Sequence, residues 1–544
     1  MMTRIHAERI ALVLCAVAAA AIGGGCGGDD AAFETGNMLR FGNGAEPQDL
    51  DPHVVTGVTE HRVLSALFEG LAGADPATLE PTPGVAESWD VSEDGLEYTF
   101  HLREDAKWSN GDPVLAQDFL YAWERILTPE MASEYAYMLF CMAGARAFYE
   151  GEITDFADVG AAAPDDRTVV VRLEHPTPYF LQMQVHQSWF PVHKATIEKF
   201  GGRTERGTRW TRAGNLVGNG LFMLERWEPN KRIVAVRNPH YWDREAVHLD
   251  GVIFYPYDES QTEERLFRVG ELHVTSTVTP NKFDVYQREN PEILQNADYL
   301  GTYYYRLNTT RPPFDDVRVR KAFALALDRD DLVRNVVRMG RKPASHFTPP
   351  DTAGYTCQHT VGYDVAEARR LLAEAGYPDG QGFPEVTLLY NTSESHKEIA
   401  ETAQAMWSQA LGVDVRLRNQ EWKVYLESMT QLDYDIVRSA WVGDFVDPIT
   451  FLECFTTDNG NNRTGWSSAA YDALIAEAVR TADRDARFAA LQEAEAILLD
   501  ELPIIPVYFY TNAWLQAPEV EGLDHNLLGY ISFKRIRLAH AAEG

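Results

Sequence analysis

The spacing of hydrophobic and polar residues changes several times in the C-terminal half of the chain, from a strand-like pattern to a helical one and back. EVTLLYNT, at residues 385–392, is a short apolar run of the kind that forms a buried strand. SESHKEIAETAQAMWSQALG follows, with apolar residues at helical spacing, a serine that can cap its start, and Gly412 at its exit. VDVRLRN then predicts a second strand. The whole segment therefore predicts a right-handed β-α-β unit with parallel strands.

Two more segments carry a helical pattern. In YDVAEARRLLAEAGYP, Asp364 is a candidate N-cap, and Gly376 predicts the end of the helix. A longer run predicts one helix from Val317 to about Val337, whose apolar residues favour burial. Because strands and helices alternate along the chain, we expect an α/β protein with several lobes.

The first residues predict a processing segment rather than a part of the fold. Two arginines precede a 13-residue apolar stretch, IALVLCAVAAAAI, which is short for a membrane span. GGGCGG follows, so residues 1–25 resemble a lipoprotein signal peptide with Cys26 as the lipidated residue, and Gly23 stands where leucine is usual. A plain secretory signal is the alternative. Residues 26–37 predict a flexible tether, so we expect an extracytoplasmic or periplasmic protein that a lipid alone holds at a membrane.

Charge and composition exclude several partners. The 544 residues carry a formal net charge of −32, and their hydrophobic content of 45% is that of an ordinary soluble globular protein. The excess negative charge would repel nucleic acid and anionic membrane faces. The acidic residues are scattered along the sequence, which predicts a solvated acidic surface. We expect a monomer that binds no nucleic acid.

The chain shows no catalytic or metal-binding signature. It has no GxSxG, HExxH or Walker motif, and no GxGxxG after a predicted strand. Past Cys26, three cysteines (Cys141, Cys357 and Cys454) lack metal-ligand spacing and allow at most one disulfide. We therefore expect no cofactor, no metal and no catalytic residue, although a pair of carboxylates of the glycosidase type stays open.

Two positions near predicted strand ends favour ligand binding. YDIVRSAW alternates as a strand and ends on Trp441, and Asp444 follows three residues later. Asp444 is either a turn former or a socket for a positive charge. His396 lies where a strand gives way to a helix, and the start of a helix favours an anion. Two opposite charges held apart suit the two ends of a zwitterionic peptide.

Three long blocks resemble the family-5 extracellular solute-binding proteins, which feed ABC importers. The first contains GVAESWDVSEDGLEYTFHLREDAKWSNGDP, and the three blocks span residues 84–126, 215–243 and 306–333. The resemblance covers about residues 38–540. It implies a type II periplasmic-binding-protein-like fold with two α/β lobes around a ligand cleft and an extra smaller domain. The expected divisions are lobe I at 38–70, 202–300 and 513–544, domain II at 71–201, and lobe III at 301–512.

The C-terminal half resembles the oligopeptide-binding members of this family through LLYNTSESHKE, NQEWKVYLESM and DYDIVRSAWVGDFVDP. The resemblance implies that Asp444 binds the peptide ammonium and that His396 is one of several basic groups receiving the terminal carboxylate. Arg438 belongs to the implied site as well, with pairing to a core acid as its alternative. The other implied ligand-binding residues are Trp422, Ala440, Trp441, Val442, Tyr135, Tyr299, Tyr304 and Val58, the last through its backbone.

The chain departs from the family pattern at four positions. Gly301 and Val442 stand where a disulfide is expected, so that bridge is absent. Met429 and Val337 stand where cations are expected, with Arg338 one step from Val337. Fewer cations for the carboxylate leave the preferred peptide length open.

The resemblance implies a binding protein rather than an enzyme. It would hold short peptides in extended form, close by a hinge motion, and deliver them to the membrane permease subunits of an ABC importer. One alternative keeps the fold and changes the solute to a dipeptide, a murein peptide, an opine, a nickel complex or an oligosaccharide. A secreted hydrolase is the other alternative.

Overall fold

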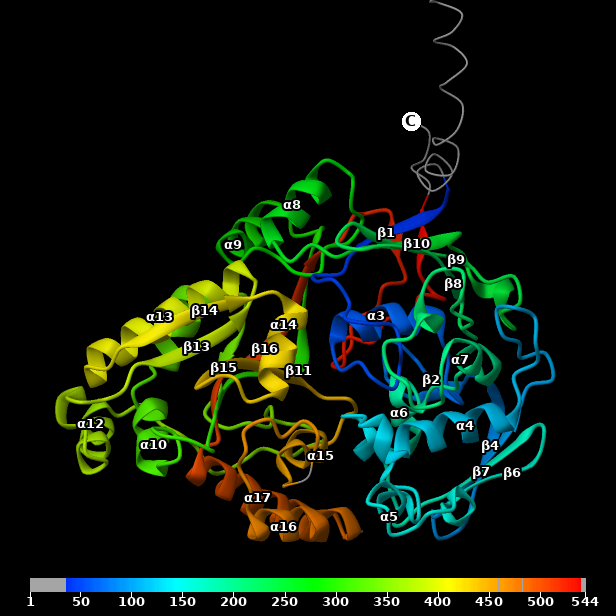
Figure 1. Ribbon diagram of the computed structural model, residues 1–544. Coiled ribbons are helices and arrows are strands. Elements are labelled where there is room, and N and C mark those ends of the chain that lie inside the picture. The colour runs from blue at the N-terminus through cyan, green and yellow to red at the C-terminus, as the bar shows by residue number, and fades with distance from the viewer. Residues whose placement is uncertain (1–35, 458, 482, 540–544) are drawn as a thin grey trace, which may run out of the picture.

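The computed structural model describes residues 36–457, 459–481 and 483–539. The expected signal peptide, Cys26 and the tether up to residue 35 lie outside these residues. Three sheets of four to six strands, two short strand pairs and the helices around them form the described part of the chain, which confirms a mixed α/β protein (Figure 1). Within that part, no helix has the length and apolar character that crossing a membrane requires.

The first sheet falls within the segments expected to form lobe I and joins distant parts of the chain. Its strand order is β1-β10-β9-β8, and β1 lies parallel to β10 although more than 200 residues separate them. The buried helix α3 (Val58–Leu67) contacts β8. The strand bounds are β1 (Met38–Gly42), β8 (Phe222–Glu228), β9 (Arg232–Arg237) and β10 (Gly251–Tyr255).

Domain II is built on an antiparallel sheet of order β4-β5-β7-β6. In β5, Tyr98, Phe100 and Leu102 are buried while the residues between them are not, as the alternation of its sequence requires. Helix α4 (Ala116–Leu127) packs against this sheet. The strands are β4 (Ala86–Val91), β5 (Glu97–Leu102), β6 (Ala161–Asp165) and β7 (Thr168–Arg172).

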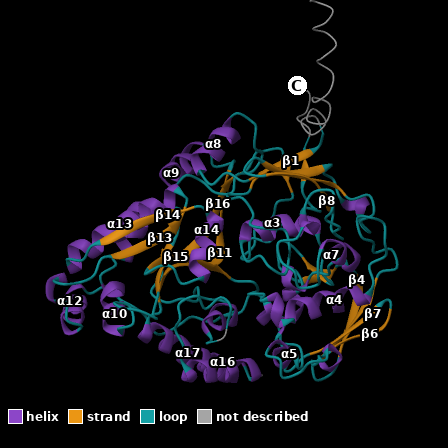
Figure 2. Ribbon diagram, viewed as in Figure 1, coloured by secondary structure: helices purple, strands orange, loops and turns teal. Residues whose placement is uncertain are grey.

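Lobe III holds the largest sheet, of order β12-β16-β11-β15-β13-β14. The predicted β-α-β unit is confirmed, because β13 and β14 are parallel and the long helix α13 joins them (Figure 2). Gly412 ends α13 in the left-handed conformation at φ 70°. The bounds are β11 (Leu294–Leu307), β12 (Lys342–Pro343), β13 (Val386–Asn391), α13 (Glu394–Leu411), β14 (Val415–Gln420), β15 (Ile436–Val442) and β16 (Ile504–Leu515).

Two long antiparallel strands, β11 and β16, run through both boundaries expected between lobes I and III. Their pairing shifts register between Asp298 and Thr302, close to residue 300. A register shift lets paired strands bend, so these strands are the natural place for a hinge. The exact division of the chain into lobes stays a prediction.

The remaining elements cover these sheets. The long helices α16 and α17 pack against each other at the lower edge of lobe III (Figure 1). The helices not yet given are α5 (Ala145–Tyr149), α6 (Phe180–Met183), α7 (Lys194–Phe200), α8 (Ser260–Arg268), α9 (Pro280–Glu289), α14 (Trp422–Thr430), α15 (Ile449–Leu452), α16 (Ala469–Arg480) and α17 (Arg484–Glu501). Short strand pairs join β2 (Ala72–Ala74) to β3 (Pro81–Pro83) and β17 (Val520–Glu521) to β18 (Arg537–Leu538).

One predicted helix is confirmed and another is wrong. Helix α12 (Val365–Glu374) begins after Asp364, whose carboxylate accepts from the Glu367 N–H. The single helix expected from Val317 to Val337 is instead α10 (Val317–Leu325), α11 (Arg329–Leu332) and a π turn over Val333–Val337. The break occurs because the Asp328 carboxylate caps a new helix start and the buried Arg329 side chain donates to carbonyls outside the run.

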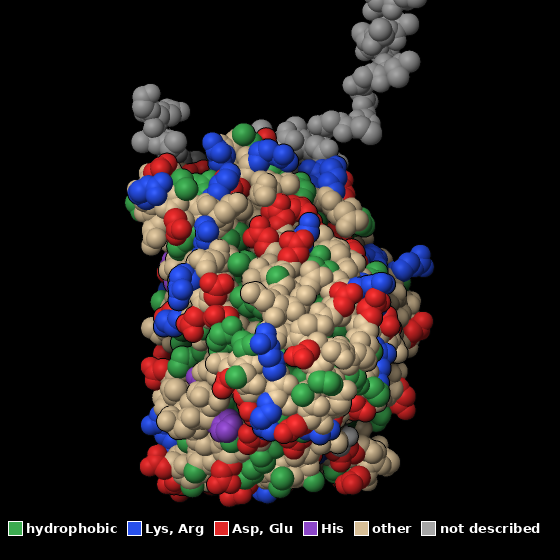
Figure 3. All heavy atoms as spheres, turned by 90° about the vertical axis from the view of Figure 1, so that its left-hand side faces the viewer, with side chains coloured by type: hydrophobic (Ala, Val, Ile, Leu, Met, Phe, Trp, Pro, Cys, Tyr) green, Lys and Arg blue, Asp and Glu red, His purple; other side chains and the backbone are tan. Residues whose placement is uncertain are grey.

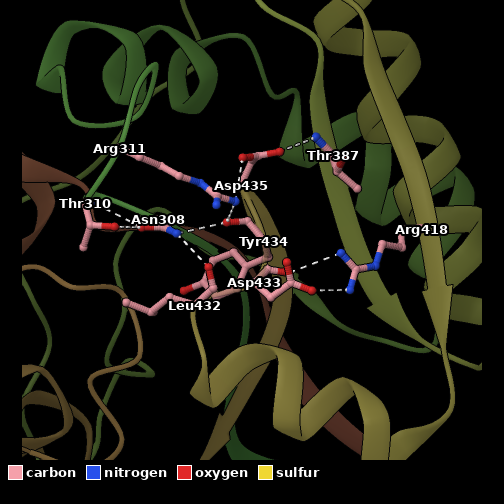
Figure 4. Close-up of polar contacts among 9 residues, drawn as sticks. All are labelled: Asn308, Thr310, Arg311, Thr387, Arg418, Leu432, Asp433, Tyr434 and Asp435. Atoms are coloured by element: carbon pink, nitrogen blue, oxygen red, sulfur yellow. Dashed lines mark hydrogen bonds and ion pairs between the residues drawn. The ribbon is translucent and has the colours of Figure 1, made fainter.

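The start of β15 is held by a network of polar contacts (Figure 4). Asn308 Nδ2 donates to the carbonyls of Leu432 and Tyr434, and Arg311 pairs with Asp435. The Asp435 carboxylate also accepts from the Thr387 N–H of β13 at 2.9 Å. These contacts fix the register of β15, which carries four of the eleven implied site residues, namely Arg438, Ala440, Trp441 and Val442.

Acidic and basic side chains are mixed on the face of the protein seen in Figure 3. On this face, the distribution agrees with a solvated acidic surface.

Candidate functional site

A cavity of about 430 Å³ lies where lobe I, domain II and lobe III meet. Its walls come from α3, α14, the C-terminal part of β15 and the C-terminal part of β16. A volume between roughly 300 and 1,000 Å³ is typical of sites for small ligands. The cavity therefore suits a short peptide or another small solute and excludes a folded partner.

Asp444 lies on the loop after β15, at the wall that domain II shares with lobe III. Its side chain is 9% exposed, and its carboxylate is 3.5 Å from Tyr135 Oη, 3.4 Å from Tyr137 Oη and 3.5 Å from His186 Nε2. The Asp444 N–H donates to Thr450 Oγ1 at 3.0 Å, which fixes the loop. No lysine or arginine contacts this carboxylate among the residues that the structure describes.

The electrostatics of Asp444 follow from this burial. Burial raises the pKa of the Asp444 carboxyl to about 7, and the hydrogen bonds from Tyr137, Tyr135 and Thr450 only partly oppose it. Burial, together with the neighbouring His61, holds the pKa of His186 well below its usual value. His186 is then neutral at pH 7, so it supplies no counter-charge. An incoming cation would stabilise the ionised Asp444 strongly.

Aromatic side chains wall the same end of the cavity. The rings of Tyr135 and Trp441 stack at 6.4 Å, and Tyr135 lies 4.4 Å from the ring of His186. Trp422, at the start of α14, stacks on Tyr425 at 5.5 Å. These rings give broad apolar surfaces that accept side chains of many shapes.

Two arginines line the cavity on the other side. Arg438 is buried, donates to Tyr510 Oη at 2.9 Å, and lies over the Tyr303 ring at 4.9 Å. Arg341 lies over the rings of Tyr508 and Tyr510. Neither arginine pairs with an acid within the described ranges, so the alternative of a core acid for Arg438 is wrong.

Several buried donors in the lining have no protein acceptor among the described atoms. Buried polar groups in native proteins are nearly always hydrogen-bonded, so such a set favours a ligand that brings acceptors. Peptide carbonyls and a terminal carboxylate are acceptors of this kind. The donors are the indole Nε1 of Trp422 and Trp441 and the Nε atoms of Arg306, Arg341, Arg438 and Arg463.

Most of the residues that the sequence implies for the site come together here. The cavity lining contains nine of the eleven, and Val58 stands at the start of α3 with 45% of its surface exposed. These nine are Val58, Tyr135, Tyr299, Trp422, Arg438, Ala440, Trp441, Val442 and Asp444.

Tyr304 and His396 lie outside the lining. Tyr304 is fully buried, and its hydroxyl accepts from Arg306 Nη2 at 2.8 Å. His396 lies 5.7 Å from the Tyr303 ring, and burial holds its pKa well below the usual value, with Arg438 and Arg341 adding to the effect. The first turn of α13 carries Glu394, whose charge offsets the anion preference expected at this helix start.

Sequence reasoning missed four arginines of the lining: Arg62, Arg306, Arg341 and Arg463. Arg341 lies four positions from Val337, where a cation was expected, and the exposed Arg338 turns away from the cavity. The chain reverses at Arg338 and Met339, both at positive φ, which a helical pattern over this segment does not predict. Arg306 lies two positions after Tyr304 in β11, and residues two apart in a strand share one face. This spacing could have predicted that Arg306 lies near the site.

The three cysteines in the described residues are free thiols, so the disulfide that stayed open does not form between them. Gly301 and Val442, which replace the expected cystine, are direct partners across β11 and β15. Over the same residues, no group of three His, Cys, Asp or Glu side chains could hold a metal ion.

Comparison with known proteins gives a consistent result. Residues 80–463 match the family model of the bacterial extracellular solute-binding proteins, family 5. The periplasmic oligopeptide-binding protein OppA of Escherichia coli K12 is 41% identical over 88% of this chain and 88% of its own length. The Haemophilus influenzae OppA structure in complex with RPPGFSPFR is 34% identical, has a TM-score of 0.87, and covers 93% of this chain and 99% of its own.

A third comparison indicates which conformation the structure resembles. The unliganded open form of the murein tripeptide-binding protein MppA is 36% identical and covers 93% of this chain and 98% of its own, yet its TM-score is only 0.62. The peptide complex with a similar identity superposes at 0.87. The arrangement of the lobes here is therefore that of the peptide complex rather than that of the open form.

Proposed function

Because this chain belongs to the bacterial extracellular solute-binding proteins of family 5, we propose that it captures short peptides in extended form for import by an ABC transporter. This membership confirms the expected fold, and it confirms a binding protein rather than an enzyme, since the relatives are named for what they bind. The peptide ligand of this chain and the residues that bind it are part of the proposal.

The observation that carries the proposal is the isolated carboxylate of Asp444. A buried acid without a cationic partner is costly, and a ligand ammonium of the kind that every unblocked peptide carries would remove that cost. Tyr135, Tyr137 and His186, the side chains within 3.5 Å of the Asp444 carboxylate, carry no positive charge that would balance it. Asp444 would thus set the register of the peptide through a charge-assisted hydrogen bond.

Positive charge lines the other end of the cavity. Arg438 and Arg341 flank Tyr510 and lack acidic partners in the described chain, so a terminal carboxylate fits between them. The backbone between the two ends would pair with exposed main-chain groups near Val58 and β15, which binds peptides without regard to sequence. Trp422 and Trp441 would receive side chains, with water filling unused space.

Closure would trap the ligand. Tyr135 from domain II and Asp444 from lobe III touch across the cavity, so a bound ammonium would contact both parts. Bending of β11 and β16 near residue 300 would open and close the cleft. The closed form would then dock on the permease subunits of the importer.

The site of action would be the outer face of a membrane. The segment at residues 1–25 is proposed as a lipoprotein signal, with Cys26 carrying the lipid and residues 26–37 acting as the tether. Metabolic labelling with a fatty-acid analogue tests the anchor, and a Cys26→Ala variant would lose the label if the proposal is right.

Native mass spectrometry of the protein purified from cells tests the ligand class. We expect a series of co-purified short peptides of several masses. One discrete non-peptide mass would overturn the proposal in favour of another solute. Cleavage products from an added peptide mixture would point to a hydrolase instead.

A further inference from the structure

The charged groups that line the cavity have the opposite sign to the whole protein. The lining includes five arginines and only two acids, Asp444 and Asp524, whereas the chain carries a net charge of −32. Arg341 and Arg438 fit a terminal carboxylate, as proposed above. Arg62 donates to Asn43 and lies near Glu263, and Arg463 pairs with Glu134. Arg306 is left as a cation with no assigned counter-ion.

Arg306 is held rigidly in the cavity wall. Its side chain is 3% exposed, its Nη1 donates to the Asn461 carbonyl at 2.6 Å, and its Nη2 donates to Tyr304 Oη at 2.8 Å. No carboxylate pairs with it among the described residues, and its Nε has no acceptor there. A buried arginine satisfied only by neutral groups keeps an unbalanced positive charge.

A series of contacts links the Arg306 guanidinium to the Asp444 end of the cavity. Asn461, which accepts from Arg306, also donates to the Glu134 carbonyl at 3.5 Å, and Glu134 precedes Tyr135 in the chain. Tyr135 in turn contacts Asp444. Met429, Ser439 and Trp441 share this part of the lining, and the Ser439 hydroxyl donates to the Met429 sulfur at 3.5 Å.

From this geometry we infer that the cavity has a carboxylate subsite at Arg306, which selects peptides with an aspartate or glutamate side chain near their amino end. The inference rests on the proposed peptide-binding function and adds a side-chain preference to it. The ligand carboxylate supplies the counter-charge that the protein does not, and Tyr304 and Asn461 keep the guanidinium in place to receive it. A planar guanidinium with free N–H groups is well suited to a carboxylate.

Calorimetry with the mature protein and short synthetic peptides tests this inference. Glutamate is moved through the first two positions of an alanine tripeptide, and each peptide is compared with its glutamine counterpart, which has the same shape and no charge. We expect the dissociation constant for glutamate to be lower by about tenfold or more at one of these positions. The acidic surface of the protein opposes such a preference, so bulk electrostatics cannot produce it.

Three variants distinguish direct binding of a ligand carboxylate by Arg306 from a purely structural role of this residue. Arg306→Met should bind the glutamate and glutamine peptides equally, and Arg306→Lys should keep part of the preference because it keeps the charge. Arg244→Met, an exposed position in lobe I, changes the net charge equally and should keep the full preference. A purely structural Arg306 would instead weaken both peptides by the same factor.

Different calorimetric results would contradict the carboxylate subsite and the proposed peptide-binding function. Equal affinity for glutamate and glutamine peptides in the unaltered protein, or a preference that survives in Arg306→Met, would overturn the subsite while leaving peptide binding intact. If neither peptide nor the alanine tripeptide bound at all, the proposed function itself would be wrong. Should Arg306→Met fail to fold, Arg306→Lys and the unaltered protein still decide the question.

Discussion

The hydroxyl of Tyr135 and the carboxylate of Asp444 meet across the cavity, with 3.5 Å between Oη and Oδ1. The two residues come from different parts of the fold and stand 309 positions apart in the chain. Beside them, Glu134 and Arg463 form an ion pair between the same two parts. Domain II and lobe III are thus joined at a point where a buried acid without a cationic partner faces the ligand space, which makes this contact the centre of the proposed mechanism.

Removing the charge of Asp444 should weaken peptide binding without lowering the stability of the protein. Asp444→Asn keeps the shape of the side chain but cannot form an ion pair with an ammonium. We expect the dissociation constant for an alanine tripeptide to rise by about 100-fold or more, because loss of one partner of a desolvated charge pair costs roughly 2–5 kcal/mol. The unliganded variant should unfold at the same or a higher temperature, since the unpaired buried charge is gone.

Calorimetry and thermal unfolding check both parts of this prediction. Asp433→Asn is the matched control, because Asp433 is exposed, pairs with Arg418 and lies outside the cavity lining. It should change neither property appreciably. A stable Asp444→Asn variant with unaltered peptide affinity would show that Asp444 only forms a turn.

Peptide binding should release a proton at mildly acidic pH. The pKa of the Asp444 carboxyl is about 7 in the closed arrangement of the lobes, so at pH 6 the group is mostly protonated there. An arriving ammonium favours the ionised form and expels about one proton per peptide. Titration calorimetry in buffers with different ionisation enthalpies measures this number. The release should be absent in Asp444→Asn and should vanish above pH 8 in the unaltered protein.

The same pKa determines how stability depends on pH. Folding raises the pKa of Asp444 above its unfolded value near ~4, so the native state binds more protons between about pH 4 and pH 7. The contribution of this group to stability is therefore lost as the pH rises through that window. Burial likewise raises the pKa of Glu263 and of Glu453 to about 7, so the difference between the unaltered protein and Asp444→Asn isolates Asp444. A difference in unfolding free energy that does not change with pH would contradict this account.

The carboxylate end of the peptide should depend on Arg341. Arg341→Met should weaken a tripeptide with a free carboxylate by about tenfold or more and leave the C-terminally amidated peptide nearly unchanged. Arg338→Met is the matched control, because Arg338 is exposed and lies outside the cavity lining. Equal losses for the acid and the amide would show that Arg341 only shapes the wall.

The local structure around α12 and α13 could be predicted from sequence because local signals decide it. Asp364 caps one helix, Gly412 ends the other, and the apolar period matches the observed burial. The segment after Val317 could not, because its break depends on the buried Arg329 and its distant carbonyl partner at Pro506. Periodicity along a chain carries no information on contacts of that range.

The acid end of the candidate site was easier to predict than the basic end. Asp444 and Trp441 follow directly from a strand and its loop, so their spacing in sequence fixes their place. The cations depend on where chain reversals occur, and the turn at Arg338 and Met339 brings Arg341 to the cavity. His396 and Tyr304 lie outside the lining, and the Tyr304 hydroxyl supports Arg306 by accepting its hydrogen bond.

Two cysteines at the paired positions Gly301 and Val442 should form a disulfide. The residues are direct partners across β11 and β15, and a Cβ at Gly301 would lie 3.3 Å from Val442 Cγ2. The Gly301→Cys, Val442→Cys double variant should resist thiol alkylation until it is reduced, and it should unfold several degrees higher when oxidised. Free thiols in the oxidised sample would contradict the observed register.

Calorimetry with a free-amine tripeptide and its N-acetylated form tests the central claim most directly. The account predicts that acetylation weakens binding to the unaltered protein by about 100-fold or more and has little further effect on Asp444→Asn. If both forms bound the unaltered protein equally well, recognition of the ammonium by Asp444 would be disproved.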